Sequence, residues 1–331
     1  MRNDAEYMFA SARIRAAEGR DTAKVRLDRM LECRSPEQLL RTVVELGFLR
    51  EDRTPPAGLT EALDMALDDA ASLVRTSVPE PELYHFLFYK YDCNNIKVAL
   101  KAGILGLDYS GEYYACGTFD PAGLAEKLQQ GNTEGLPAHM GEAVAEATAA
   151  YAETGEGRVI DFCLDRACFA DTADCVNASG VELFRDWAAA KADVTNILSS
   201  VRLSSRGTKE AAGAVFARAF VPGGTMPMER FLVDGCMGYE ELQEVLEPGL
   251  LKDAVERILA QGENARPEKE FENALHRIMN REKFTPFGVH IPAVFFVNRE
   301  AELKNCRILA AALTAGISGN ELRERIRVDY V

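Results

Sequence analysis

The sequence lacks the short motifs that identify most nucleotide-binding and hydrolytic enzymes. It contains no GxxxxGK[ST] loop and no GxSxG elbow. The glycines of Gly155-Glu156-Gly157 lack the third glycine and the preceding strand of a dinucleotide fingerprint, so this segment is predicted to be a turn between helices. We therefore expect no ATP hydrolysis by this chain, no catalytic residues and no cofactor.

Metal-binding patterns are also scarce. There are four histidines, and none stands in an HxH or HxxxH arrangement. None of the eight cysteines forms a CxxC pair. Cys163, Cys168 and Cys175 lie near one another in the sequence, but no histidine accompanies them, so no zinc site is predicted. In a chain of this length the cysteines are expected to be reduced and mostly buried.

One acidic group leaves a metal-dependent alternative open. Asp64, Asp68 and Asp69 lie on one predicted helix. Helical enzymes can bind Mg²⁺ through such carboxylates, but they need a second, facing acidic set. No matching motif is present, so a solvated helix face is the favoured interpretation, and a Mg-dependent helical enzyme remains the less favoured alternative.

Long apolar runs and an excess of basic residues are missing as well. No segment approaches ~20 uninterrupted apolar residues, so no membrane span and no direct lipid insertion are expected. The first twenty residues lack the apolar core of a signal peptide, which predicts a cytoplasmic protein. The net charge of −14 argues against a nucleic-acid partner and against adsorption to anionic lipid.

Helical periodicity runs through nearly the whole chain. Apolar residues recur at spacings of three and four, and Ser35-Pro36-Glu37 has the residues of a helix start. Two runs that could be strands in isolation, 84–89 and 289–297, lead directly into helical patterns and are predicted to be helical. The fold class is therefore all-α. The predicted helices include 57–78, 138–151, 159–176, 181–203, 209–220, 250–261, 271–281 and 292–313.

An internal repeat is the most informative pattern. An acidic residue precedes an asparagine by three positions at Asp92/Asn95, Asp193/Asn196 and Glu302/Asn305, and the asparagines are 101 and 109 residues apart. This period predicts three similar helical units, 1–112, 113–218 and 219–331, around a pseudo-threefold axis. A solenoid fits less well, since solenoid repeats are usually about 20–50 residues long.

The spacing within each copy suggests what these residues do. Residues three apart lie on one helix face, and a buried asparagine must satisfy both ends of its amide. Hydrogen bonds to a neighbouring chain segment would do this and fix one packing geometry. Structural packing is thus the favoured role, and direct docking of a partner is the minor one. The candidate residues are Asp92, Asn95, Lys97, Asp193, Asn196, Arg202, Glu300, Glu302, Asn305 and Arg307.

Residues 292–309 carry a family resemblance. Here an apolar helix runs into Glu300-x-Glu302-x-Lys304-Asn305-x-Arg307-Ile308. This pattern resembles the signature of the C subunit of archaeal and bacterial V/A-type rotary ATPases, whose eukaryotic homologue is the d subunit of the V-ATPase. The resemblance extends to segments elsewhere in the chain. They are Tyr7 to Glu18, the Asp92 and Asp193 helices, Phe220-Val221-Pro222-Gly223-Gly224, Gly316-Ile317, Glu321 to Arg327, and Tyr330-Val331.

The resemblance implies a funnel-shaped, non-catalytic adaptor. In that family one face docks on the membrane proteolipid rotor ring, and the other receives the D and F subunits of the central shaft. The protein would then be held at the membrane through the ring and would transmit torque during proton or sodium transport. The alternative is an α-helical repeat scaffold of an unrelated soluble complex.

Overall fold

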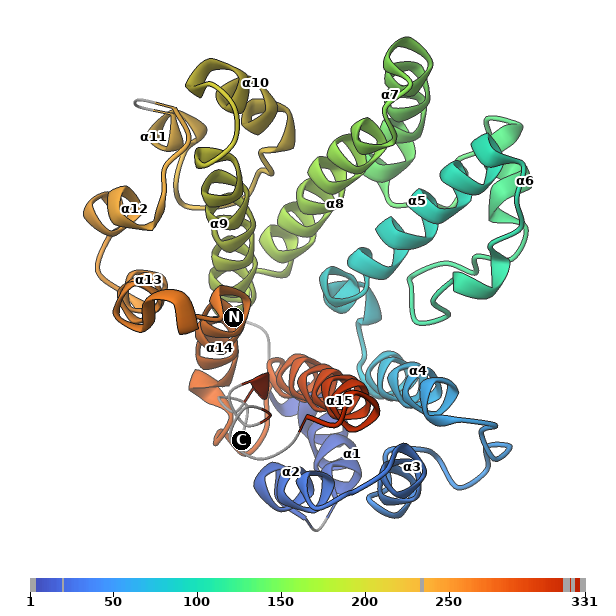
Figure 1. Cartoon of the computed structure of the whole chain (residues 1–331). Coiled ribbons are helices and arrows are strands. Elements are labelled where there is room, and N and C mark those ends of the chain that lie inside the picture. Colours follow the sequence, from blue (N-terminus) through green and yellow to red (C-terminus); the bar gives the residue numbers. More distant parts are fainter. Residues whose placement is uncertain (1–3, 20, 233–234, 318–321, 323–324, 328–331) are drawn as a thin grey trace. The chain divides into compact units, whose positions relative to one another are not determined.

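The computed structural model describes residues 4–19, 21–232, 235–317, 322 and 325–327. The protein is 72% helix, and the described residues contain no strand, which confirms the all-α prediction (Figure 1). Several positions of the C-terminal family resemblance (321, 323, 324, 330 and 331) lie outside the described residues. Within that part of the chain, no helix combines the length and apolar character needed to cross a membrane.

Two compact units make up the chain. The first consists of Met1–Pro81 and Asn264–Val331, so it contains both ends of the sequence. Its α-helices are α1 (Met8–Glu18), α2 (Ala23–Leu31), α3 (Pro36–Glu45), α4 (Leu59–Ser77), α14 (Pro267–Met279) and α15 (Ile291–Ala315). Short 3₁₀ helices also occur, η1 (Asp4–Tyr7) and η5 (Asn280–Glu282).

The second unit is Glu82–Glu263. Its α-helices are α5 (Tyr89–Leu105), α6 (Leu124–Gln129), α7 (Ala138–Thr154), α8 (Gly157–Ser179), α9 (Glu182–Ser204), α10 (Lys209–Ala219), α11 (Met228–Phe231), α12 (Tyr239–Val245) and α13 (Leu250–Gln261). The 3₁₀ helix η3 (Ser110–Glu112) also lies in this unit, and η2 (Pro81–Leu87) and η4 (Gly262–Asn264) lie at its two boundaries with the first unit. The division of the chain into three units of similar length stays a prediction.

Local sequence signals account for many helix ends. Helix α3 begins at Pro36, and the Ser35 hydroxyl accepts a hydrogen bond from the Gln38 N–H at 3.2 Å, as the Ser-Pro-Glu pattern predicts. Helix α15 ends at Gly316, whose positive φ of 69° suits a glycine. Gly103 does not end a helix, because α5 continues through it to Leu105 and ends at Gly106.

The two ambiguous runs are helical. Residues 84–87 lie in η2, which leads into α5, and residues 291–297 form the first two turns of α15. The turn Gly155-Glu156-Gly157 separates α7 from α8, also as predicted. Gly155 ends α7 with a positive φ of 67°, a backbone conformation that glycine adopts at little cost.

The apolar side chains form the core of each unit. In the first unit, α15 packs against α1, α2, α3, α4 and α14. The apolar first half of α15 is almost entirely buried, which makes this helix the centre of its unit. In the second unit, α7 packs along α8, and both join α5 and α6 around a shared core that includes Ile96, Met140 and Leu164. The three helices that carry the repeat signature, α5, α9 and α15, thus all lie against other helices.

Candidate functional site

The repeated acid and asparagine occupy equivalent places on α5, α9 and α15. All six side chains are at most 3% exposed. The two residues of each pair therefore share one buried helix face. A buried carboxylate or amide is costly unless its polar atoms are paired, so the partners of these groups decide what the repeat does.

Each asparagine binds the main chain of a single residue in a later segment. The side-chain NH₂ donates to that residue's carbonyl, and the side-chain oxygen accepts from its N–H. The three pairs are Asn95 with Tyr114 (2.8 and 2.9 Å), Asn196 with Val221 (2.9 and 3.0 Å) and Asn305 with Arg327 (2.8 and 3.0 Å). We call these three pairs the asparagine clamps. Because both groups of one peptide residue are bound, each clamp fixes the position of the segment relative to its helix.

The acid completes the clamp on α5 and α9. Thr118 donates its N–H (2.8 Å) and its hydroxyl (2.7 Å) to the carboxylate of Asp92. Thr225 makes the same two bonds to Asp193, at 3.0 and 2.6 Å, and Met226 adds a third N–H at 3.1 Å. These donors satisfy carboxylates that would otherwise be buried without partners.

A glycine precedes each of these threonines for a steric reason. A Cβ built on Gly117 would lie 2.1 Å from an oxygen of Asp92, and one on Gly224 would lie 2.2 Å from an oxygen of Asp193. Any other residue would push the carboxylate out of place. The clamped loop therefore has its own signature, Gly-Thr, which is not part of the predicted repeat. The dipeptide occurs at 117–118 and 224–225, but also at 207–208, so it could have revealed the partner loops only together with their distance from Asp92 and Asp193.

The third copy uses its acid differently. Glu302 has a longer side chain than Asp, and it accepts from the Arg26 guanidinium of α2 at 2.6 and 2.8 Å. Arg26 also donates to the main-chain carbonyls of Glu18 and Asp21, at 2.8 and 2.5 Å. Glu302 thereby ties α15 to the start of the chain. Sequence reasoning did not identify Arg26, since nothing local to it resembles a signature.

Two of the basic candidates extend the contacts of their helices. Lys97, two positions after Asn95, pairs with Asp165 of α8 at 2.6 Å. Arg307, two positions after Asn305, pairs with Asp64 of α4 at 2.8 Å. Burial disfavours the charged form of Lys97, but Cys93 and Asp165 outweigh that effect and raise its pKa. The ammonium is thus held in its charged form.

The remaining two candidates are less buried than the acids and asparagines. Arg202 is exposed in the last turn of α9, and Glu300 is half-buried on α15. A neighbour of Arg202 that was not predicted has a clearer role. The Ser200 hydroxyl accepts from the Met237 N–H at 2.8 Å and donates to its carbonyl at 3.1 Å. Helix α9 therefore binds two later segments.

The acidic patch on α4 has arginine partners. The Asp69 carboxylate accepts from the Arg53 guanidinium at 2.8 and 3.0 Å, and from the Arg50 N–H at 3.1 Å. Asp64 is paired with Arg307. Within the described residues, no cluster of three His, Cys, Asp or Glu side chains could hold a metal ion. Two of the three carboxylates thus serve in ion pairs, which weakens the magnesium alternative.

The contacts of the signature residues hold the helices and loops in fixed positions. The acid and asparagine side chains of the signature are buried, and their hydrogen bonds and ion pairs join each helix to a distant segment. Comparison with known proteins agrees with the whole-chain pattern. The chain is 23% identical to the C subunit of the A-type ATP synthase of Thermococcus gammatolerans, over 97% of this chain and 89% of the relative.

A second relative has nearly the same identity and coverage. The C subunit of the A-type ATP synthase of Methanocaldococcus jannaschii is 22% identical over 96% of this chain and 86% of its own length. A family model described as "ATP synthase (C/AC39) subunit" matches residues 10–325, a span that includes all three signature helices. The chain therefore belongs to the ATP synthase (C/AC39) subunit family, whose members are non-catalytic subunits.

Proposed function

We propose that this protein is the central-stalk adaptor of an A/V-type rotary ATPase, joining the membrane proteolipid rotor ring to the D and F subunits of the shaft. The observation that carries the proposal is the family match over residues 10–325, together with two relatives that align along nearly their whole length. In this role the protein is peripheral to the membrane, held there by the ring, and it transmits torque while nucleotide is processed elsewhere.

The clamps are the features that suit this work. An adaptor under torque has to keep its helices and loops in register. Each clamp binds both polar groups of one main-chain residue within the buried interior, so sliding of the loop would break two hydrogen bonds at once. We propose that the acids, the asparagines, Lys97 and Arg307 brace the protein itself, and that docking surfaces for partners lie elsewhere.

The packing of the signature helices supports the three-unit arrangement. Helix α5, in the predicted unit 1–112, packs on α8 of the predicted unit 113–218. Helix α15, in the predicted unit 219–331, packs on α4 of the predicted unit 1–112. Contacts of this kind, from one unit to the next and from the last to the first, are those that three units closed around a pseudo-threefold axis would make.

The experiment is a reconstitution of the rotary complex with and without this chain. A tagged copy purified from its native membrane fraction should recover the proteolipid ring and the shaft subunits. Complexes that lack the chain should still hydrolyse ATP in the catalytic head but should no longer pump ions. Recovery of neither ring nor shaft, or ion pumping that persists without the chain, would contradict the proposal and favour a scaffold of an unrelated complex.

A further inference from the structure

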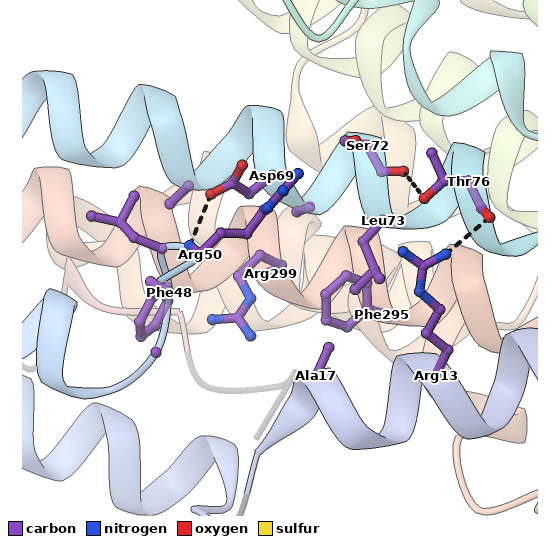
Figure 2. Close-up of a pocket in the computed structure, with 14 residues that line it drawn as sticks. Arg13, Ala17, Phe48, Arg50, Asp69, Ser72, Leu73, Thr76, Phe295 and Arg299 are labelled. Carbon is purple, nitrogen blue, oxygen red and sulfur yellow. Dashed lines mark hydrogen bonds between the residues drawn. The ribbon is translucent and has the colours of Figure 1, made fainter. Parts of the chain in front are cut away.

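A cavity of about 460 Å³ lies in the first compact unit, between α1, α4, α15 and residues 47–50 (Figure 2). Its volume falls within the roughly 300–1,000 Å³ typical of small-molecule sites. It is separate from the asparagine clamps. Much of the wall is apolar and comes from Ala17, Phe48, Ala66, Ala70, Leu73 and Phe295.

One wall of the cavity is a buried guanidinium. Arg299 of α15 is only 5% exposed, and its guanidinium carbon lies 4.3 Å from the ring centre of Phe48 and 5.5 Å from that of Phe295. Figure 2 shows Arg299 between these rings. Its Nη1 has no hydrogen-bond acceptor among the described residues. The Glu302 carboxylate lies 3.5 Å from this atom, as an ion pair without a hydrogen bond.

The charges around Arg299 do not balance. Glu302 is the carboxylate ion-paired with Arg299, but it is already engaged by Arg26 at 2.6 and 2.8 Å. Glu18 adds a weaker favourable charge and is itself paired with Arg15. Asp69, the acid in the cavity wall, is held by Arg53. Burial lowers the pKa of Arg299, because removing the charged guanidinium from water costs free energy. An anion entering the cavity would offset this cost and supply the missing acceptor.

The entrance adds further positive charge. Arg13 and Arg50 also line the cavity, and both are exposed. Arg13 donates to the Thr76 carbonyl at 2.9 Å, and because a carbonyl carries no net charge, this bond does not neutralise the guanidinium. Arg50 is paired with Asp52 outside the cavity wall. Arg13 therefore contributes a positive charge that attracts an anion, whereas the charge of Arg50 is offset by Asp52.

From these observations we propose that the cavity binds a monocarboxylate with an apolar or aromatic body, anchored by Arg299. A planar carboxylate matches the donor geometry of a guanidinium. The walls of Phe48, Phe295, Leu73 and the alanines accept hydrocarbon. One surplus charge suits a singly charged group better than a phosphate dianion, because the second charge of the dianion would be desolvated without a partner. The site is additional to the adaptor function and does not depend on it.

The test is isothermal titration of the full-length chain with 4-phenylbutyrate and with its neutral isostere 4-phenylbutyramide. We expect saturable one-to-one binding of the acid, and affinity for the amide lower by at least about tenfold, which corresponds to about 1.4 kcal/mol. No binding of the acid, or equal binding of both compounds, would overturn the proposal. Tighter binding of inorganic phosphate than of the acid would overturn the carboxylate assignment.

Two variants locate the site. Arg299→Gln removes the anchor but leaves the Arg26–Glu302 pair intact, and it should weaken binding of the acid by at least about tenfold. Ala17→Phe should fill the cavity and reduce binding similarly while all charges remain. The matched control is Ala16→Phe, on the exposed neighbouring position of α1, which should bind as the wild type does. Circular dichroism melts check that each variant is folded, and unchanged binding by Ala17→Phe would contradict this location.

Discussion

At the scale of the residue, the asparagine clamps stabilise the fold because they are buried. An exposed amide would exchange its protein partners for water at little cost, whereas Asn95, Asn196 and Asn305 are fully buried. Removing such a side chain leaves a main-chain N–H and a carbonyl without partners in a dry environment. The cost of the change is therefore set by the orphaned groups more than by the bonds themselves.

Asn196→Ala should lower the free energy of unfolding by about 2–5 kcal/mol, because both polar groups of Val221 lose their partner. Urea denaturation measures this. Asn177→Ala, at an exposed position of α8, is the control and should change stability by less than about 0.5 kcal/mol. Equal effects of the two substitutions would show that the clamp is energetically unimportant.

Gly224→Ala should destabilise the protein by more than about 2 kcal/mol, because its Cβ would displace the carboxylate of Asp193 from Thr225. When Asp193 is also replaced by alanine, Gly224→Ala should lower the free energy of unfolding by less than it does alone. A double-mutant cycle measures this coupling. Gly111→Ala has open space around its Cβ and serves as the control. Additive effects at 193 and 224 would contradict the steric explanation.

Asp68 gives a pH-dependent prediction. Burial, with smaller contributions from the neighbouring Asp64 and Asp69, raises the pKa of Asp68 to about 6. The folded protein therefore favours the protonated form, and this stabilisation is lost as pH rises from about 4, the unfolded value, through about 6. Asp68→Asn should raise stability at pH 8 by about 1 kcal/mol, after allowance for partial exposure, and by less at pH 5.

Urea denaturation at both pH values checks this. Asp64→Asn is the comparison, and it should lower stability slightly at pH 8, because it breaks the pair with Arg307. An identical gain from Asp68→Asn at pH 5 and pH 8 would show that the carboxyl does not titrate in this range.

The sequence predicted only one of the two partners in each contact. The acid and asparagine of each signature were found because they repeat on helices, where spacing determines the face. The loop partners of the asparagines and of Asp92 and Asp193 lie 19 to 33 residues later, and loop length differs between copies, so spacing alone cannot locate them. Arg26 and Glu302 are 276 residues apart, a pairing that only the tertiary fold brings about.

At the scale of the element, periodicity predicted helices well and their short connections poorly. Helices α4, α7, α8, α9 and α15 agree with the predicted segments because each buries a long apolar stripe. Helices α6, α11 and α12 are only four to seven residues long, too short for such a stripe to emerge. Ion pairs also join the helices, and the free energy by which each pair stabilises the fold depends on how deeply it is buried.

We expect Lys97–Asp165 to stabilise α5 on α8 more than Arg307–Asp64 stabilises α15 on α4. The Lys97 and Asp165 side chains are 17% and 45% exposed, whereas those of Arg307 and Asp64 are 42% and 51% exposed, so the first pair differs in the burial of its cation. Double-mutant cycles with methionine and asparagine should give coupling of about 1–2 kcal/mol for the first pair and below about 1 kcal/mol for the second. Only the second should weaken strongly in 1 M NaCl, and the opposite order would contradict the burial argument.

At the scale of the whole molecule, both ends of the chain build one unit. Helix α15 fills the space between α1, α2, α3 and α4, which precede it by more than 200 residues. Without α15, the apolar faces that bury Ile14, Leu63 and Val74 would lose much of their cover. The sequence could not reveal this closure, since hydrophobic patterns describe each helix but not its partner.

The first unit should therefore need both segments to fold. Residues 1–81 alone should be poorly structured, and co-expression with residues 264–331 should give a stable complex with a cooperative thermal transition. Residues 82–263 should fold alone, because their core is formed within that segment. Circular dichroism and size-exclusion chromatography test this. A cooperative melt for 1–81 by itself would show that α15 is dispensable to its unit.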